Sequence, residues 1–218
     1  MTTYITDIET DGLLDDVTII HSIVYQDFDT KVITSCNDHG YEVPGVFRHL
    51  TIEEGLTELR EAEKVVYHNG IKYDIPVQEK LHGWEAGGIV EDTLVMTRLL
   101  WSNIKDSDIT RVRQGTLPGK LMGSHSLEAW GYRMKKWKGD YAKERTADLK
   151  AKHERMGLPA PTDEELRLYV WGEWNEEMQD YCVQDVIVTA DLYSRILAKG
   201  YAPEALMLEH EAATVCAQ

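Results

Sequence analysis

The sequence predicts an α/β domain with a mixed β-sheet flanked by helices. Short β-branched segments come first in the chain, and strand-like and helix-like segments alternate after them. With 218 residues, the chain is long enough for one domain with a core of ordinary size and a modest insertion. Its 43% hydrophobic and 28% charged residues are typical of a globular protein.

Four segments have the composition of strands. The triplet YIT before Asp7 and the β-branched segment Thr18–Phe28 come first, and Lys31–Asn37 follows a turn that indicates a hairpin. Lys64–Asn69 is apolar in the way of a buried strand. The apolar segment Glu91–Trp101 fits a strand or a helix, and the sequence leaves this choice open.

Capping signals mark the ends of the predicted helices. Thr51 and Thr162 each precede a glutamate by three residues, the capping-box arrangement that opens a helix. Gly83 and Gly200 are expected to end helices, because glycine adopts the left-handed conformation that closes them. The predicted helical segments are 72–83, 126–134 and 175–199, with a polar, peripheral helix and loop over 140–161.

The charge of the chain is unevenly distributed. A net charge of −15 argues against a nucleic-acid partner, because phosphate contacts favour Lys and Arg. Residues 111–145 nevertheless hold nine basic and three acidic side chains, so this window is +6 and the rest of the chain is −21. The basic strip could hold a polyanion locally, or it could be a solvated helix face and loop.

Nothing in the sequence indicates a membrane or an oxidising compartment. No apolar run approaches the ~18 residues that a membrane helix needs, and the N-terminal MTTYITDIET lacks the regions of a secretory signal. The cysteines Cys36, Cys182 and Cys216 are too scattered for a disulfide framework or a zinc knuckle. We therefore expect a protein of the reducing cytoplasm without a membrane partner.

Four acidic residues lie at the ends of separate predicted elements. Asp7 and Glu9 end the first strand and point to the same face, because strand side chains alternate. Asp74 begins a helix and Asp185 lies on the last long one, so all four could converge at the carboxyl edge of the sheet. Like charges brought together require a cation or protons in compensation. The alternative for Asp7 and Glu9 is two solvated acids leaving an edge strand.

A four-carboxylate cluster suits hard divalent ions such as Mg²⁺ or Mn²⁺. Two such ions about 4 Å apart form the clamp that serves in-line phosphoryl displacement. Tyr181 lies one helical turn before Asp185, so the two side chains share a helix face. The alternative is a structural Ca²⁺ site, which predicts metal-dependent melting without nuclease activity.

Three motifs carry a family resemblance. DIET, HNGIKYD and YCVQD resemble the motifs of DnaQ-like 3′→5′ exonucleases of the tyrosine (DEDDy) subclass. Position 180 is Asp180 and not histidine, which argues against the histidine subclass. HNGIKYDIPVQEKL, DTLVMTRLLWSNIKDSD, LPGKLMGSHSLEAWGYRMKKWKGDY and WNEEMQDYCVQDVIVTADLY are similar to the proofreading domain of podovirus-type bacteriophage family A DNA polymerases. The resemblance covers most of residues 1–200.

The resemblance implies a fold and a domain division. It implies an RNase H-like fold, in which a mixed five-stranded sheet is flanked by helices. Residues 1–200 would form the exonuclease domain, with a peripheral insertion at about 140–174. Residues 201–218 would be a linker and the start of a helix that leads to, or docks on, a polymerase domain. The apolar face of Leu206, Leu208, Ala212 and Val215 would then be the docking surface.

The resemblance also implies an activity. The chain would remove 5′-mononucleotides from single-stranded or frayed DNA 3′ ends, as proofreading for a phage polymerase in the cytoplasm of the infected host. The residues implied to be catalytic are Asp7, Glu9, Asp74, Tyr181 and Asp185. The four carboxylates would hold two divalent ions, Mg²⁺ or Mn²⁺, and Tyr181 would orient the attacking water.

Six residues are expected to contact the DNA: Thr10, Leu13, Asn69, Arg111, Arg113 and Lys120. Thr10 and Leu13 would meet the terminal nucleotide, although ordinary packing is an alternative for Leu13. Asn69 has a second interpretation, in which it only satisfies the Asn-Gly turn. The three basic residues belong to the basic strip. Trp171 and Trp174 are interpreted as packing against the core.

Two other functions remain open at this point. A DEDDy-type RNase would use the same residues, and an assay on matched RNA and DNA 3′ ends separates the two. A catalytically silent nucleic-acid-binding scaffold for a polymerase partner is the other alternative. It would be favoured by loss of a carboxylate, but all four carboxylates and Tyr181 are present.

Overall fold

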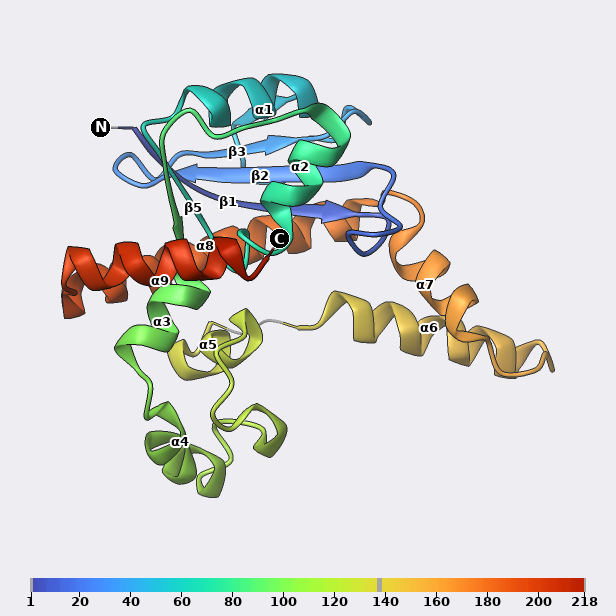
Figure 1. The fold of residues 1–218 in the computed structure, drawn as a ribbon. Helices are drawn as coiled ribbons and strands as arrows, with labels where there is room; N and C mark the ends of the chain where they lie inside the picture. The colour runs from blue at the N-terminus through green and yellow to red at the C-terminus, as the bar shows by residue number, and fades with distance from the viewer. Residues whose placement is uncertain (1, 137–138, 218) are drawn as a thin grey trace.

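The computed structural model describes residues 2–136 and 139–217. Within these ranges a six-stranded mixed sheet, in the order β4-β3-β2-β1-β5-β6, forms the centre of the molecule (Figure 1). The strands are β1 (Thr3–Thr10), β2 (Ile20–Asp27), β3 (Ile33–Cys36), β4 (Arg48–Leu50), β5 (Lys64–Tyr67) and β6 (Ile89–Asp92). β2 pairs antiparallel with β1 and β3, while β1 with β5, β5 with β6 and β3 with β4 pair in parallel.

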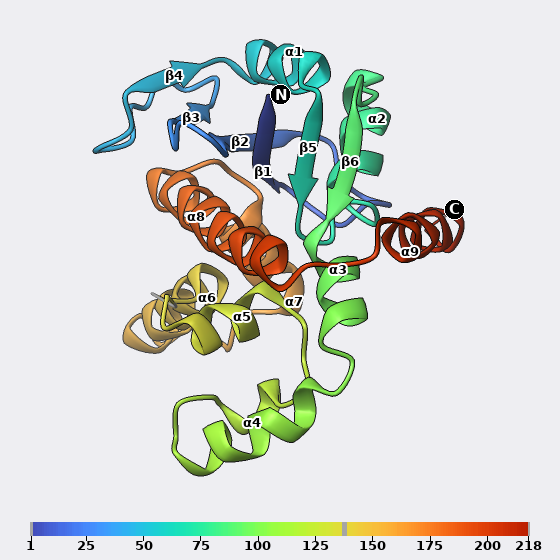
Figure 2. The same ribbon diagram turned by 90° about the vertical axis from the view of Figure 1, so that its left-hand side faces the viewer.

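Helices cover both faces of this sheet. They are α1 (Ile52–Glu61), α2 (Asp74–His82), α3 (Thr93–Leu100), α4 (Ile104–Arg113), the 3-10 turn η1 (Gly119–Leu121), α5 (Leu127–Met134), α6 (Tyr141–Arg155), α7 (Asp163–Trp171), α8 (Glu176–Lys199) and α9 (Pro203–Val215). Figure 2 shows α1 and α2 on one side of the sheet and α8 on the other. None of the helices in the described ranges is long and apolar enough to cross a membrane.

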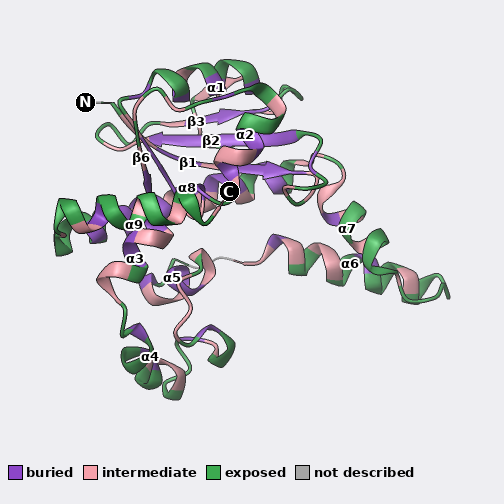
Figure 3. Cartoon of the chain, viewed as in Figure 1, coloured by how far each residue is buried: buried purple, intermediate pink, exposed green. Residues whose placement is uncertain are grey.

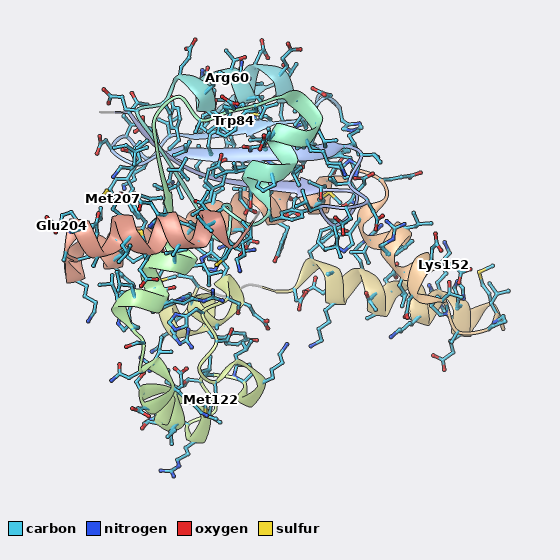
Figure 4. The ribbon with its side chains drawn as sticks, in the orientation of Figure 1. Arg60, Trp84, Met122, Lys152, Glu204 and Met207 are labelled. Atoms are coloured by element: carbon cyan, nitrogen blue, oxygen red, sulfur yellow. The ribbon has the colours of Figure 1, made fainter. Side chains whose placement is uncertain are left out.

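The alternation of β1 divides the core into two layers. Ile5 packs with Leu192 and Ile196 of α8, whereas Ile8 packs with Leu59 of α1 on the opposite face. The buried side chain of Trp84 fills the α1 layer, where its Nε1 donates to the carbonyl of Leu56 at 2.8 Å (Figure 4). The odd-numbered side chains of β1 therefore face α8.

The sheet has six strands, so the expected count of five was wrong. The additional edge strand β4 has three half-buried residues, too few for any alternation to reveal it. It is held in place by pairing with β3 and by the ion pair of Arg48 with Glu58 of α1. The choice between strand and helix for residues 91–101 is now clear, because the segment contains the end of a strand and then a helix. β6 ends at Asp92, and the carboxylate of Asp92 accepts from the backbone N–H of Leu94 at 2.8 Å and so caps the start of α3.

The predicted helix boundaries are confirmed where a cap defines them. Thr51 and Thr162 both form complete capping boxes, and Gly83 ends α2 at a φ of 58°. Gly200 ends α8 at a φ of 74°. By contrast, α4 is polar and was not predicted. The hairpin of α6 and α7 projects from the sheet (Figure 1) and is largely exposed (Figure 3).

Candidate active site

The carboxyl end of β1 places two carboxylates on the α8 face of the sheet. Asp7 and Glu9 alternate with Ile8, which packs in the opposite layer. The β1–β2 register shifts between Glu9 and Thr10, and such bulges re-aim side chains near functional sites. Glu9 is only 8% exposed. Two acids are thus fixed side by side under α8, as the alternation predicted.

Asp74 reaches the same place from α2. It is the first residue of that helix and is 4% exposed. Burial raises the pKa of Asp74 to about 7, while hydrogen bonds from the backbone N–H groups of Asp74 and Ile8 act in the opposite direction. The charge of Asp74 also raises the pKa of Asp7 and of Glu9, so a residue from α2 lies near the strand that carries them.

The long helix α8 supplies the fourth carboxylate and the tyrosine. Asn175 caps this helix by accepting from the backbone N–H of Met178 at 3.0 Å. One turn apart, Tyr181 and Asp185 interact, and the interaction with the Tyr181 hydroxyl partly offsets the burial that raises the pKa of Asp185 to about 7. Burial also raises the pKa of Tyr181, so its phenol stays protonated. Tyr181 therefore points toward the carboxylates.

The four carboxylates interact strongly with one another. Burial raises the pKa of Asp7 well above its ordinary value, and the nearby charges of Asp74, Asp185 and Glu9 raise it further. Burial is also the largest cause of the raised pKa of Glu9, and the charges of Asp185 and Asp74 raise it further. Charges of one sign at this density call for a cation. Carboxylate oxygens from three elements are the donors that Mg²⁺ and Mn²⁺ prefer, so the residues present fit such ions.

Cys182 is a neighbour of this cluster that the sequence did not single out. It is fully buried, and its thiol donates to the backbone carbonyl of Asp7 at 3.5 Å. Its sulfur lies 4.0 Å from the Oδ2 atom of Asp7. The sulfur and one carboxylate oxygen each of Asp7 and Glu9 lie within 4.8 Å of one another, so the thiol adjoins the cluster. The thiol supports the backbone of β1 from the core side.

The loop after β1 is held beside the cluster by Tyr73. The Tyr73 hydroxyl bonds to the hydroxyl of Thr10 and donates to the carbonyl of Gly12 at 2.5 Å. Thr10 is buried, whereas Leu13 in the same loop is 75% exposed. The structure thus places Thr10 and Leu13 next to the carboxylates, with a solvent-facing leucine that packs against little of its own chain. Tyr73, which we did not predict as a site residue, fixes this arrangement.

Asn69 lines a different cavity from Glu9 and Thr10. Asn69 has a φ of 72°, in the left-handed region that Asn tolerates, and its backbone N–H donates to the carboxylate of Asp92 at 2.9 Å. It lines a separate cavity of about 250 Å³ with residues that include Arg98 and Cys216. This position matches the turn-forming interpretation of Asn69.

The three basic residues expected to contact DNA also lie away from the cluster. Arg111 and Arg113 are on α4, which Figures 1 and 2 both show at the far end of the molecule from the sheet. Arg111 lies 3.6 Å from the buried carboxylate of Asp108. Lys120 is 65% exposed and lies 3.2 Å from Glu128. Any contact they make would be with a part of the ligand remote from the carboxylates.

Comparison with known proteins relates the chain to phage polymerases. No protein-family model matches it. It is 38% identical over 207 residues to the DNA-directed DNA polymerase of Escherichia phage T7, an alignment that covers 91% of this chain and 27% of the polymerase. It is 39% identical over 208 residues to that of Enterobacteria phage T3, with the same coverage. The chain thus spans only 27% of the length of each relative.

Solved nuclease structures share the fold. A structure described as the apo form of the nuclease has a TM-score of 0.54 at 15% sequence identity. The match covers 99% of this chain and 79% of the chain in that structure. Brucella melitensis NrnC has a TM-score of 0.52 at 12% identity, also with 99% and 79% coverage. The expected nuclease-type α/β fold is confirmed. The chain is homologous to the N-terminal region of the phage T7 and T3 DNA polymerases and has the DnaQ-like fold of these nucleases.

Proposed function

We propose that this chain is a 3′→5′ exonuclease that hydrolyses the terminal phosphodiester of single-stranded or frayed DNA and releases 5′-mononucleotides. The observation that carries this proposal is the convergence of Asp7, Glu9, Asp74 and Asp185 with raised pKa values at one edge of the sheet. Homology to part of two DNA polymerases favours DNA as the substrate.

The carboxylates divide into two sets of metal ligands. Asp7, Glu9 and Asp185 would hold one divalent ion, and Asp74 would share a second with Asp7. Bound there, two ions stabilise the charge that develops on the attacking and leaving oxygens of a phosphodiester. A structure described as Brucella melitensis NrnC with bound Mg²⁺ has a TM-score of 0.51, and we propose Mg²⁺ or Mn²⁺ for this chain.

Tyr181 acts as an orienting group in this proposal. Its protonated hydroxyl interacts with Asp185 and with the other carboxylates of the cluster, and we propose that it bonds to the attacking water there. Because burial keeps the phenol protonated, Tyr181 positions the water and does not remove its proton.

Loss of a general base lowers kcat roughly 100-fold to 10,000-fold. Replacing Tyr181 with phenylalanine is expected to lower kcat too, but by a factor below this range. KM should change little, because the metal ligands stay in place. Steady-state digestion of single-stranded DNA measures both constants. Tyr41→Phe is the matched control, since Tyr41 bonds to Asp180 at 3.3 Å outside the cluster and should keep full activity. A Tyr181→Phe loss as large as that of a carboxylate variant would make the tyrosine a proton acceptor instead.

Replacing Arg111, Arg113 and Lys120 together with alanine is expected to flatten the salt dependence of single-stranded DNA binding. Each lost phosphate contact lowers the slope of log K against log salt by about 0.7, so three contacts give about 2. Fluorescence anisotropy across a salt series measures the slope. Lys152→Ala, on the outer part of α6 (Figure 4), is the control. An unchanged slope would assign the three residues to a solvated surface.

We further propose that the activity proofreads for a phage DNA polymerase in the infected host's cytoplasm. The division into a nuclease at 1–200 and a connecting or docking segment at 201–218 belongs to this proposal. In α9, Leu206 is 5% exposed and packs inward. The expectation that Leu206 belongs to an external docking face was therefore wrong. Met207, Leu208 and Val215 remain 60%, 64% and 71% exposed. Met207 (Figure 4) and Val215 line a cavity of about 750 Å³ beside β6, and these exposed side chains of α9 are the candidate contact for the polymerase.

Matched substrates test the proposed function against the alternatives. A DNA strand and an RNA strand of one sequence, each labelled at the 5′ end, should show stepwise shortening from the 3′ end for DNA. Faster shortening of RNA would favour the DEDDy-type RNase. Binding of both strands without cleavage in Mg²⁺ or Mn²⁺ would favour the silent scaffold. Metal-dependent melting without cleavage would favour a structural cation site.

A further inference from the structure

Gln179 is a fully buried glutamine in α8, the helix that carries Tyr181 and Asp185. It lies two residues before Tyr181 and six before Asp185, which is about 9 Å along the helix axis from the latter. A polar side chain at this depth is costly unless all its polar atoms are hydrogen-bonded. The proposed reaction does not use Gln179, so its burial requires a separate explanation.

All four hydrogen-bonding positions of the Gln179 carboxamide are occupied. Its Oε1 accepts from the hydroxyl of Ser22 at 2.6 Å and from the Nε1 of Trp174 at 3.1 Å. Its Nε2 donates to the hydroxyl of Ser35 at 2.9 Å and to the carbonyl of Cys36 at 3.3 Å. An indole N–H only donates and a carbonyl only accepts, so the carboxamide has one possible orientation. The side chain is therefore fixed by a complete network.

This network ties α8 to two strands of the sheet, next to the carboxylate cluster. Ser22 lies in β2 directly opposite Glu9 of β1. Side chains opposite each other in antiparallel strands share a face, with their Cβ atoms about 5 Å apart. Ser35 lies in β3, and both serines are completely buried. Gln179 thus fastens α8 to the immediate neighbour of Glu9.

The stripe of α8 that follows Gln179 on the sheet side is apolar. Cys182, Val183 and Val186 come three, four and seven residues after it and pack with Val24 of β2. The hydrophobic effect is non-directional, so such contacts allow a helix to slide or to rotate by a fraction of a turn. Hydrogen bonds, by contrast, depend on distance and angle. The Gln179 network supplies the direction that the apolar contacts lack.

We propose that Gln179 is a positioning residue: it sets the register of α8 on the sheet and thereby the place of Tyr181 and Asp185 relative to Asp7 and Glu9. A helix moves as a unit over two turns, so a shift at Gln179 is carried to Asp185. A misplacement of about 1 Å can cost roughly 100-fold in rate. The inference rests on the proposed exonuclease function, and in it Gln179 acts through α8 and not by contact with the substrate or the ions.

The first test is Gln179→Met, because methionine is unbranched and of similar length but forms none of the four bonds. On single-stranded DNA, kcat is expected to fall roughly tenfold to a hundredfold. KM should stay near the wild-type value, since the proposed nucleotide contacts Thr10 and Leu13 belong to β1 and the loop after it. Isothermal titration calorimetry without DNA should show Mn²⁺ binding weakened roughly tenfold, as is typical when a residue that orients a metal ligand is lost.

A second variant separates the register of α8 from the stability of the fold. Gln179→Met leaves the buried hydroxyls of Ser22 and Ser35 without their partner, which by itself lowers Tm. The triple variant Ser22→Ala/Ser35→Ala/Gln179→Met removes the hydroxyls as well, and replacing both partners by apolar groups is often nearly neutral. Its Tm should exceed that of Gln179→Met, whereas kcat and Mn²⁺ binding should stay low. The triple variant also provides the test if Gln179→Met does not fold.

Tyr25→Phe is the matched control. The hydroxyl of Tyr25 in β2 donates to the carboxylate of Glu58 at 2.6 Å, in the α1 layer on the other face of the sheet. Its removal should lower Tm, because a partly buried hydrogen bond is lost. Both kcat and Mn²⁺ binding should stay at the wild-type values.

Two results would overturn the inference. The first is a folded Gln179→Met protein with wild-type kcat and Mn²⁺ binding. The second is a triple variant in which kcat and Mn²⁺ binding recover together with Tm, because Gln179 would then serve stability alone. A wild-type protein that binds Mn²⁺ but degrades no DNA would instead contradict the proposed function, and the Mn²⁺ titrations of the variants would still decide whether Gln179 positions α8.

Discussion

Replacing Asp7 with alanine is expected to reduce Mg²⁺-dependent degradation of single-stranded DNA by roughly a thousandfold or more. Loss of even one group that stabilises transition-state charge costs about 10²–10³ in rate, and Asp7 would serve both ions. Asp185→Ala should have a similar effect. Because Asp7 lies among like charges that raise its pKa, the substitution should not unfold the protein. Digestion rates and a thermal melt of each variant measure the two effects.

A matched control distinguishes this result from a general effect of charge. Asp16 is an exposed acid in the β1–β2 loop, close in sequence to Asp7 but without a place in the cluster. Asp16→Ala should keep wild-type activity. A clean Asp7→Ala preparation that degrades DNA at the wild-type rate would show that the carboxylate cluster is not the catalytic centre.

Replacing Asp185 with asparagine is expected to stabilise the metal-free protein at pH 8. Burial raises the pKa of Asp185 from 3.8 to about 7. Between these values the folded state binds more protons than the unfolded state, so the wild-type protein loses stability as pH rises through this window. The destabilisation is absent below pH 3.8 and complete above about pH 7. Asparagine has nearly the same shape as aspartate and carries no charge, so it removes this destabilisation.

The free energy of unfolding is expected to rise by about 2 kcal/mol. A shift of one pKa unit corresponds to about 1.4 kcal/mol, so the pKa shift of Asp185 alone would imply a larger gain. The gain is smaller because the coupled carboxylates share the effect. For a chain of this size it corresponds to a rise in Tm of roughly 4–8 °C. Melts in EDTA from pH 5.5 to 8 measure it. Saturating Mg²⁺ should stabilise the wild type more than the variant. Parallel pH profiles for the two proteins in EDTA would contradict the electrostatic account.

Local chemistry made part of the fold predictable. The capping boxes at Thr51 and Thr162 and the glycine at position 83 act within one helical turn, so sequence was sufficient to place them. The alternation of β1 likewise predicted that Asp7 and Glu9 share a face. Strand β4 was missed because its three residues carry no period, and its position depends on pairing with β3.

The rest of the site depends on contacts between distant segments. Gln179 bonds to β2 and β3 only because α8 folds back onto strands that lie more than a hundred residues earlier in the chain. Tyr73 carries a hydroxyl and directly precedes Asp74 in the sequence. Its hydrogen bond to the carbonyl of Gly12 could nevertheless not be predicted, because no sequence spacing relates the two residues. Asn69 illustrates the reverse case, since the Asn-Gly turn accounts for it without a ligand.

The most direct test of the central claim is the digestion of a 5′-labelled DNA strand in Mg²⁺ and in EDTA, single-stranded and paired, with Asp7→Ala as the control. The proposed function predicts a ladder that shortens one nucleotide at a time from the 3′ end in Mg²⁺, with release of 5′-mononucleotides. It predicts no shortening in EDTA or with Asp7→Ala. Equal degradation in EDTA, or undiminished degradation by Asp7→Ala, would contradict it.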